Sequence, residues 1–299
     1  MNIYRWHKNG VMNATMPNPF YDVGSNNTTQ GLVLYLPFNN DTKDYSGLGN
    51  HGTSIAGVDC GIGISGKIGT GCSFPGSHSY INITNGISLN LSTTGALAAW
   101  IKTSVSSGHA HIFGKGNWQN DVNGYIFEIY NNNLMVELAD ASGYQQIQIS
   151  GVTVANNNWH YVVFTWNDSI YLYMDGASVM TPTARTKTPK SDVYNLWIGD
   201  SHVYTSASYS GSMDEVAIWN RTLSANEVKA LYYGGVTGGS VLNSSLLSNG
   251  DNWTVEVTPC DYLECGTPAN SSVLSIMNAP TQGTPLLNST DYPTNRTTG

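Results

Sequence analysis

Charged residues are scarce in this sequence. Of its 299 residues, 12 are Lys or Arg and 20 are Asp or Glu, so 11% are charged, against about 25% in an average soluble domain. The cations are scattered and the formal net charge is −8. Because a nucleic-acid-binding surface needs clustered Lys and Arg, this composition excludes nucleic acid as a partner.

Long hydrophobic runs are also missing. The longest, such as residues 96–101 and 161–164, are far shorter than the roughly 18 residues that indicate a membrane span. Met1 is followed by polar and aromatic residues and not by the apolar stretch of a secretory leader. We therefore expect either a protein not exported by that route or a piece of a longer precursor. Apolar residues still make up 40% of the chain, which excludes wholesale disorder.

Asn, Ser, Thr and Gly take the place of the missing charge. Thirteen Asn-x-Ser/Thr sequons occur, more than this composition gives by chance, which predicts surface loops open to N-glycosylation. The alternative is that an Asn- and Thr-rich chain forms such triplets without any modification. The sequons are Asn13, Asn26, Asn27, Asn40, Asn82, Asn90, Asn167, Asn220, Asn243, Asn252, Asn270, Asn288 and Asn295.

The four cysteines form two local pairs, Cys60 with Cys72 and Cys260 with Cys265. Four cysteines allow three pairings, and the local one is the most economical. A zinc site is the alternative, but neither pair has CxxC spacing and the seven histidines are dispersed. We therefore expect two disulfides, an oxidising compartment, and an extracellular or cell-surface location.

Short strands recur along the chain. Alternating or continuous apolar segments rich in β-branched and aromatic residues, separated by Gly, Asn, Asp and Ser, predict an all-β sandwich. These segments are residues 80–84, 125–130, 134–138, 145–150, 159–166 and 170–174. Asp175-Gly176 predicts a tight hairpin turn. One helix is expected over residues 224–233, with a capping box of Ser224 and Glu227, a staple of Leu223 and Val228, and Gly234 at its end.

Six motifs, in order, resemble the LamG-like (laminin G type, concanavalin A-like) jelly-roll family. After the opening segment, residues 31–52, they are residues 66–81 (GKIGTGCSFPGSHSYI), 98–102 (AAWIK), 158–166 (NWHYVVFTW), 172–176 (LYMDG), 196–199 (LWIG) and 211–228 (GSMDEVAIWNRTLSANEV). The resemblance covers about residues 28–235 and implies two antiparallel sheets in a concanavalin A-like jelly roll.

The flanks resemble a different unit, an Ig-like repeat of exported surface proteins. Residues 4–10 (YRWHKNG) are similar to its central strand, and residues 252–261 and 271–276 are similar to its last two strands. We therefore expect the jelly roll to be inserted into an Ig-like β-sandwich unit. The expected domains are 1–24, the first part of the Ig-like unit; 25–236, the jelly roll; 237–279, the closing strands; and 280–299, a tail or the start of a next repeat.

The Ig-like unit predicted in this way is incomplete and has an open sheet edge. An open edge is a liability unless another strand pairs with it. We expect a strand from the tail or from another subunit to complete the sheet by strand addition. Self-association through this unit is therefore one possible partner interaction.

Carboxylates are too few and wrongly spaced for a glycosidase, which needs two of them flanking the scissile bond. None of the six glutamates belongs to an E-x-D-x-E strand motif. Glu128 and Glu137 lie on neighbouring expected strands, but both alternate with apolar residues, so we expect them to face solvent. No G-x-S-x-G motif occurs. We therefore expect no catalytic residues.

A structural calcium ion is implied by the resemblance, since many relatives hold one between the opening segment and the closing strand. Asn39, Asp41 and Asp44 lie in the opening segment, and Asp214-Glu215 lies on the closing strand. Oxygen ligands of this kind suit Ca²⁺, and we take Asn39, Asp44 and Asp214 as the ligands. The alternative is that Asp44 caps a turn and Asp214 accepts a buried hydrogen bond.

Most tryptophans are expected in a core, because Trp6, Trp100, Trp159, Trp166, Trp197, Trp219 and Trp253 lie in strand patterns. Trp118 is the exception, since it stands in a polar loop and could serve as a sugar platform. Tyr144, with Gln145 and Gln146, and His202, with Tyr204, could line the same rim. We take Trp118, Tyr144 and His202 as candidate ligand-binding residues. The alternative is that Trp118 packs against a neighbour.

Two functions remain open. The first is an extracellular, non-catalytic adhesion module that binds a glycan or a surface protein. The second is a structural subunit of a surface layer or filament, assembled by strand addition between chains. A polysaccharide-active enzyme is a distant third.

Overall fold

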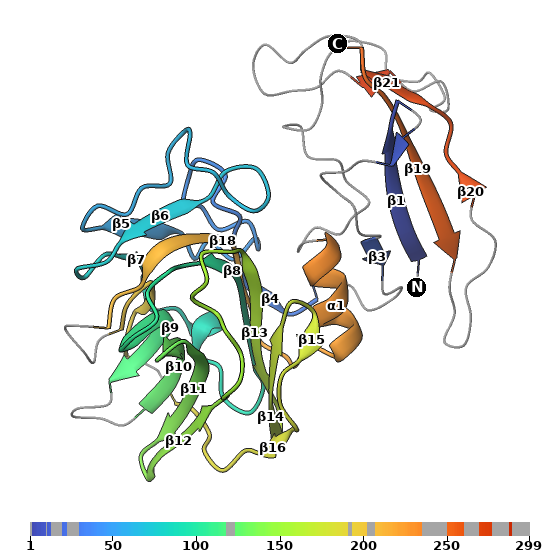
Figure 1. Cartoon of the computed structure of the whole chain (residues 1–299). Coiled ribbons are helices and arrows are strands. Elements are labelled where there is room, and N and C mark those ends of the chain that lie inside the picture. The colour runs from blue at the N-terminus through green and yellow to red at the C-terminus, as the bar shows by residue number, and fades with distance from the viewer. Residues whose placement is uncertain are drawn as a thin grey trace. The chain divides into compact units, whose positions relative to one another are not determined.

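A computed structural model describes residues 2–9, 11–12, 20–22, 30–117, 123–190, 193–201, 207–234, 250–259, 269–276 and 287–288. The chain divides into two compact units (Figure 1). One is continuous, Thr29–Val228, and the other joins Met1–Thr28 to Lys229–Gly299. No helix among the described residues is long and apolar enough to cross a membrane.

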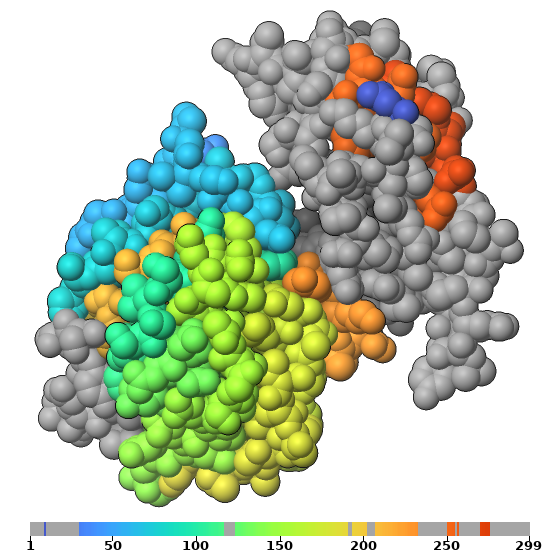
Figure 2. Space-filling view, in the orientation of Figure 1, coloured from blue at the N-terminus to red at the C-terminus, as the bar shows by residue number. Residues whose placement is uncertain are grey.

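The continuous unit contains two antiparallel sheets. Sheet 1 has the strand order β12-β11-β10-β9-β17-β7-β5, and its strands β9 to β12 are drawn in green in Figures 1 and 2. The strands β10, β11 and β12 match expected segments, whereas β9 is not expected from the sequence. The bounds are β5 Gly52–Ile55, β7 Tyr80–Ile83, β9 His109–Asn117, β10 Asn123–Tyr130, β11 Asn133–Asp140, β12 Gly143–Gln148 and β17 Leu196–Ile198.

Sheet 2 has the order β15-β14-β13-β8-β18-β4, with β16 paired to β14 and β6 paired to β18. Its bounds are β4 Leu32–Leu36, β6 Cys72–Pro75, β8 Gly95–Lys102, β13 His160–Trp166, β14 Ser169–Met174, β15 Ala177–Ser178, β16 Thr183–Ala184 and β18 Ser210–Trp219, and a 3₁₀ turn spans Ile87–Leu89. The β14–β15 hairpin turns at Asp175 and Gly176, both with positive φ, as the Asp-Gly signal predicts.

The core lies between these two sheets. Phe127 of sheet 1 meets Phe164 of sheet 2 edge to face, with ring centroids 5.9 Å apart, and Trp166 packs on Phe164 at 4.7 Å. All three side chains are fully buried. Aromatic side chains of this size bury about 150–250 Å² each, so they contribute much of the apolar burial that stabilises the sandwich.

Helix α1 (Ala225–Gly234) follows sheet 2. Its capping box forms as predicted, since Glu227 Oε2 accepts from the Ser224 backbone N–H at 2.8 Å and Ser224 Oγ accepts from the Glu227 N–H at 3.3 Å. Leu223 and Val228, the expected staple, are both buried. The Leu223 N–H donates to Thr165 Oγ1, which ties the helix start to β13.

The discontinuous unit is built around sheet 3, with the order β2-β1-β19-β21-β22. Strand β1 pairs with β19 over seven residues, although more than 240 residues separate them, and Figure 1 shows them side by side. The bounds are β1 Asn2–Lys8, β2 Val11–Met12, β3 Phe20–Asp22, β19 Asn252–Pro259, β20 Ala269–Asn270, β21 Leu274–Ile276 and β22 Leu287–Asn288. Strand β22, from the tail, pairs with β21. The Ig-like character of this unit and self-association through it stay predictions.

Candidate functional site

The outer face of sheet 1, opposite the core, carries buried ionisable groups. On β10 the side chains of Tyr125, Phe127 and Ile129 belong to the core, so Glu128 between them faces outward. His111 is paired with Glu128 in the β9–β10 register, and His109 lies two residues earlier on the same face. Residues 207–208 lie beside β9, because the His111 N–H donates to the Ala207 carbonyl at 2.9 Å and His111 forms a parallel bridge with Ser208.

These three side chains converge. His109 Nδ1 lies 2.8 Å and His111 Nε2 3.3 Å from the same oxygen, Glu128 Oε2. His111 and Glu128 are buried, whereas the His109 side chain is 33% exposed. In the described part of the chain, this is the one group of three or more His, Cys, Asp and Glu whose ligand atoms all lie within 4.8 Å of one another.

Burial shifts the protonation of this cluster. Desolvation lowers the pKa of His111 to about 3, helped by the nearby His109 charge. Burial also raises the pKa of Glu128 above its usual value, against the opposing effect of His109. The hydrogen bond with Glu128 raises the pKa of His109. The proton of the cluster is therefore held between His109 and Glu128, and His111 stays neutral.

A stacked aromatic pair lies on the same outer face, toward the other edge of the sheet. The rings of Tyr80 (β7) and Trp197 (β17) are 4.0 Å apart and inclined by 20°. Asn82 Oδ1 accepts from Trp197 Nε1 and from Asn195 Nδ2, both at 3.0 Å, which fixes the indole. Both rings are half-buried, so part of the pair is open to solvent.

Between the His109–His111–Glu128 group and the Tyr80–Trp197 pair, the backbone of residues 200–201 lies close to Gly114. Gly114 of β9 is paired with Trp197, and a Cβ atom there would lie only 2.6 Å from the Asp200 carbonyl oxygen and from Ser201 Cβ. Residues 200–201 therefore fold directly over this position, which admits only glycine without a shift.

Of the three candidate ligand-binding residues, only Tyr144 lies within the described residues. Tyr144 lies on β12, is 58% exposed, and points to the outer face of sheet 1, as does its neighbour Gln146, which donates to Glu137 Oε1 at 2.7 Å. Trp118, His202 and Tyr204 lie outside the described residues. Tyr144 therefore shares a sheet face with Tyr80 and Trp197, and its role in binding stays a prediction.

The expectation that Glu128 and Glu137 face solvent is wrong. Both point away from the core, but Glu128 is 1% and Glu137 8% exposed. The two histidines contact Glu128 and Gln146 donates to Glu137, and strand alternation alone does not predict these contacts. In the β10–β11 register the two glutamates are diagonal neighbours, since Glu128 is paired with Met135 and Glu137 with Ile126.

The tryptophan expectations hold for most of the described residues. Trp100, Trp166, Trp219 and Trp253 are buried, whereas Trp159 and Trp197 are half-buried; nothing is described of the Trp6 side chain. Sequence reasoning missed Trp197, Tyr80 and the His109–His111 pair. The signal for the histidines was present in His-Ala-His-Ile, where they alternate with apolar residues and so share one strand face.

The calcium candidates are engaged in hydrogen bonds. Asp44 Oδ1 accepts from the backbone N–H groups of Tyr35 and Ser46, and Oδ2 accepts from Ser46 Oγ and the Asn50 N–H. A carboxylate offers about four lone-pair positions, so in this arrangement Asp44 has none left for a metal. It holds the turn of the opening segment.

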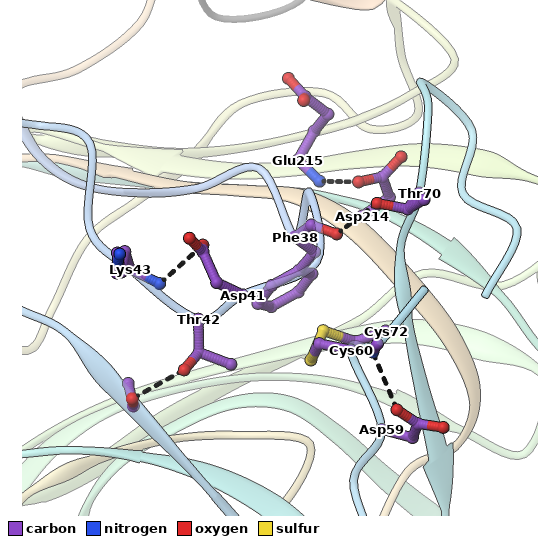
Figure 3. Close-up of a disulfide and its surroundings, with 12 residues drawn as sticks. Phe38, Asp41, Thr42, Lys43, Asp59, Cys60, Thr70, Cys72, Asp214 and Glu215 are labelled. Atoms are coloured by element: carbon purple, nitrogen blue, oxygen red, sulfur yellow. Dashed lines mark hydrogen bonds between the residues drawn. A yellow bond between two sulfur atoms is a disulfide. The ribbon is translucent and has the colours of Figure 1, made fainter. Parts of the chain in front are cut away.

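Asp214 is engaged in a similar way on sheet 2. Its Oδ2 accepts from the Lys67 and Ile68 N–H groups, both at 2.8 Å, and Oδ1 accepts from the Glu215 N–H (Figure 3). Burial and the Glu215 charge raise the pKa of Asp214 to about 8, against the lowering effect of these donors. Asp41 lies on the opening segment, and its Oδ1 accepts from the Lys43 N–H at 3.1 Å.

The residues present therefore do not fit a calcium ion without losing backbone hydrogen bonds, and Asn39 is exposed. Calcium at Asn39, Asp44 and Asp214 stays a prediction. Chelation followed by thermal melting would test it.

The disulfide between Cys60 and Cys72 is present as predicted (Figure 3). It closes the loop whose Lys67 and Ile68 N–H groups donate to Asp214. Cys260 and Cys265 lie outside the described residues.

Among the described sequons, Asn40, Asn220, Asn252 and Asn270 are exposed and Asn82, Asn90 and Asn167 half-buried. Only the backbone of Asn288 is described, and Asn13, Asn26, Asn27, Asn243 and Asn295 lie outside the described residues. Glycosylation at all of these positions stays a prediction.

Two antiparallel sheets packed over one core, with a short closing helix, define a jelly-roll sandwich of the lectin type. The family model of the concanavalin A-like lectin/glucanases superfamily matches residues 75–229. The chain belongs to this superfamily, as the LamG-like motifs predict. No curated protein sequence matches the chain.

Solved structures share the fold at low sequence identity. Domain 4 of AbnA, an extracellular arabinanase from Geobacillus stearothermophilus in complex with arabinotriose, is 17% identical, with a TM-score of 0.56 over 67% of this chain and 98% of that one. The binding domain of Paraclostridial Mosquitocidal Protein 1 is 15% identical, with a TM-score of 0.57 over 85% and 72%.

A botulinum neurotoxin type C structure is also similar, and its description links cell entry to interaction with two ganglioside molecules. It is 15% identical, with a TM-score of 0.54 over 70% of this chain and 52% of that one. The chain thus spans about half of that toxin structure. At such identities the likeness is one of fold.

Proposed function

We propose that the jelly roll is a non-catalytic glycan-binding module that works outside the cell, and that the outer face of sheet 1 is its binding surface. The observation that carries this proposal is the stacked, half-exposed pair of Tyr80 and Trp197. An aromatic face held in one orientation offers a sugar ring an apolar platform, while neighbouring polar groups can bond its hydroxyls.

The arrangement of the face supports an extended ligand. Tyr144 on β12 and Tyr80 on β7 point to the same side of sheet 1, with five strand spacings between them. At about 4.8 Å per spacing, the face measures roughly 24 Å from one aromatic group to the other. Asn82 and Gln146 supply amide groups beside these rings.

Binding is favoured over catalysis because the outer-face glutamates, Glu128 and Glu137, are buried beside neighbouring side chains and not open to a substrate. Glu128 lies against two imidazoles and Glu137 accepts from Gln146. Two of the similar solved structures support the same choice, since one was solved with arabinotriose and the description of the other concerns gangliosides. The disulfide and the exposed sequons favour an extracellular location.

A glycan array probed with the full chain tests the proposal. We expect binding to one or more oligosaccharides, and at least a ten-fold loss of affinity in both Trp197→Ala and Tyr80→Ala. Tyr171→Ala is a matched control, because Tyr171 is a half-buried tyrosine on β14 of sheet 2; its affinity should be unchanged. Tyr144→Ala shows whether the ligand reaches β12.

Two results would contradict the proposal. Glycan binding that survives both Trp197→Ala and Tyr80→Ala would place the ligand elsewhere. Release of sugar from a polysaccharide, lost in Glu128→Gln or Glu137→Gln, would make the protein an enzyme.

A further inference from the structure

His109, His111 and Glu128 surround one point on the outer face of sheet 1 with three metal-ligand atoms. Around a tetrahedral zinc ion with bonds of about 2.0–2.1 Å, ligand atoms lie roughly 3.3–3.4 Å apart. The separations to Glu128 Oε2 are 2.8 Å for His109 Nδ1 and 3.3 Å for His111 Nε2. All three atoms lie within 4.8 Å of one another, so small side-chain movements would bring them to coordination distance.

The three side chains are held by regular structure. His109 and His111 come from β9 and Glu128 from β10, two hydrogen-bonded neighbours in sheet 1. The His109 ring packs on Tyr130 with ring centroids 4.3 Å apart, and the backbone of His111 is bonded to Ala207. A site built on paired strands with packed side chains loses little entropy when an ion binds.

We propose that this cluster binds one divalent transition-metal ion of the zinc class. Two imidazoles and one carboxylate form a donor set that suits zinc and its neighbours, whereas calcium and magnesium prefer oxygen donors alone. His109 is the partly exposed member of the three, so the fourth coordination position opens on its side. Three protein ligands with one open position leave room for water or for an oxygen of a bound ligand.

The competing explanation is a hydrogen-bonded His–Glu–His network that never binds metal. Both explanations account for the short contacts, but they differ in what happens when an ion is offered. A network has no reason to prefer Co²⁺ or Zn²⁺ over Mg²⁺. A site with this donor set does, because imidazole binds zinc-class ions far better than it binds magnesium.

The test uses the metal-free full chain. We expect isothermal titration with Zn²⁺ to give one equivalent per chain at this site, and Co²⁺ in its place to give the intense visible absorption of a tetrahedral ion. Mg²⁺ should give neither. These readouts do not involve a glycan, so the inference stands or fails separately from the proposed function.

Substitutions of the proposed ligands test whether the ion binds at this cluster. His109→Gln and Glu128→Gln should each weaken binding at least ten-fold and abolish the Co²⁺ absorption. His109→Gln is the primary variant because His109 is partly exposed, so its loss leaves the fold intact; a melting curve checks this. His160→Gln is the matched control, since His160 Nδ1 also lies 2.8 Å from a carboxylate, that of Asp175. Among the described residues no second imidazole joins this pair in a metal-ligand group.

The inference is overturned by any of three results. The first is no saturable Zn²⁺ binding by the folded chain. The second is an unchanged Co²⁺ spectrum in His109→Gln. The third is an equal loss of binding in His160→Gln, which would mean that scattered surface histidines hold the metal.

Discussion

Each sheet of the jelly roll buries a carboxylate on its outer face, and the two are held by different partners. Asp214 of sheet 2 accepts three backbone N–H groups, two of them from the disulfide-closed loop. Glu128 of sheet 1 lies instead against two histidine side chains. Burying a carboxylate destabilises a protein unless hydrogen bonds or charges compensate for the lost water. The groups that compensate each carboxylate therefore indicate whether its role is structural or concerns binding.

Backbone partners make Asp214 a structural group. Two of its three donors are Lys67 and Ile68, and Lys67 also lies over the Trp100 ring at 4.5 Å, so this loop covers the outer face of sheet 2 at Trp100. Trp100 and Tyr161 are buried under that cover with their rings 5.3 Å apart. The outer face of sheet 2 is thus a second, smaller core.

Glu128 is held by the side chains of His109 and His111, so it can lose or gain a proton or a metal ion without a change in the backbone. Imidazoles can release a proton or take a metal ion without unfolding a loop, and His109 reaches solvent. The aromatic platform of Tyr80 and Trp197 lies on the same face. The proposed glycan-binding surface and the proposed metal site therefore both lie on sheet 1, whereas the buried Asp214 of sheet 2 is held by backbone N–H groups.

The largest effect should come from removing the carboxylate of sheet 2. Asp214→Ala leaves the buried Glu215 N–H group and the part-buried N–H groups of Lys67 and Ile68 without their acceptor. An unpaired buried group costs about 1–3 kcal/mol, and the two part-buried groups should each cost about 1 kcal/mol, so we expect a loss of roughly 3–5 kcal/mol in the free energy of unfolding. Glu128→Gln keeps the shape and an acceptor oxygen, so its loss should be about 1–2 kcal/mol. Denaturant unfolding of both variants gives the comparison.

Asp214→Asn is the control for volume, because it retains one carbonyl oxygen and should lose less than Asp214→Ala. Equal losses for Asp214→Ala and Glu128→Gln would show that the two carboxylates do the same work, and the contrast between the sheets would fail.

A smaller effect is expected from the disulfide. Cys60 and Cys72 close a loop with a sequence separation of 12, and opening a loop of this size costs about 3 kcal/mol through the greater entropy of the unfolded chain. The double variant Cys60→Ala, Cys72→Ala should lose about this much stability, measured by denaturant unfolding. At low temperature, where the sandwich remains folded, glycan binding on sheet 1 should be unchanged.

The matched control is the double variant Cys260→Ala, Cys265→Ala, which removes the other cysteine pair from a segment outside Thr29–Val228. If the first double variant lost binding while still folded, the loop that covers sheet 2 would also shape sheet 1, and the two faces could not be treated as independent.

Much of this fold is readable from the sequence, because strand alternation, the Asp-Gly turn and the Ser224–Glu227 capping box are local signals. The jelly-roll motifs give the order of the strands, and Cys60 with Cys72 gives the disulfide. These features depend on residues that are near one another in the chain, or on a family pattern.

The candidate site was less predictable, for a physical reason. Alternation shows that Glu128 points away from the core, but not that it meets the imidazoles of His109 and His111, which come from the neighbouring strand. The pairing of His111 with Glu128 depends on a β-bulge between β9 and β10, where the register shifts at Phe127 and Glu128. Trp197 reaches Tyr80 only because β17 lies between β9 and β7. None of these placements has a local signal.

The smallest effect concerns the helix start that closes over sheet 2. Burial alone would raise the pKa of Glu227, but its hydrogen bonds with Arg221 and Ser224 lower it below the usual value. A carboxyl with a lowered folded pKa stabilises the protein above its unfolded pKa, and this contribution disappears as the pH falls through the folded value. Glu227→Gln should therefore cost about 1 kcal/mol near pH 7, and the difference from the wild type should shrink toward pH 3.

Melting temperatures of both proteins across this range measure the effect. Ser224→Ala is the matched partner, because Ser224 and Glu227 bond each other, so the double variant should cost less than the sum of the single variants. Additive losses would mean that the two residues act separately. A gap that widened toward acid would reverse the sign of the Glu227 contribution, and the helix start would then be held by apolar packing of Leu223 and Val228 and not by its charge.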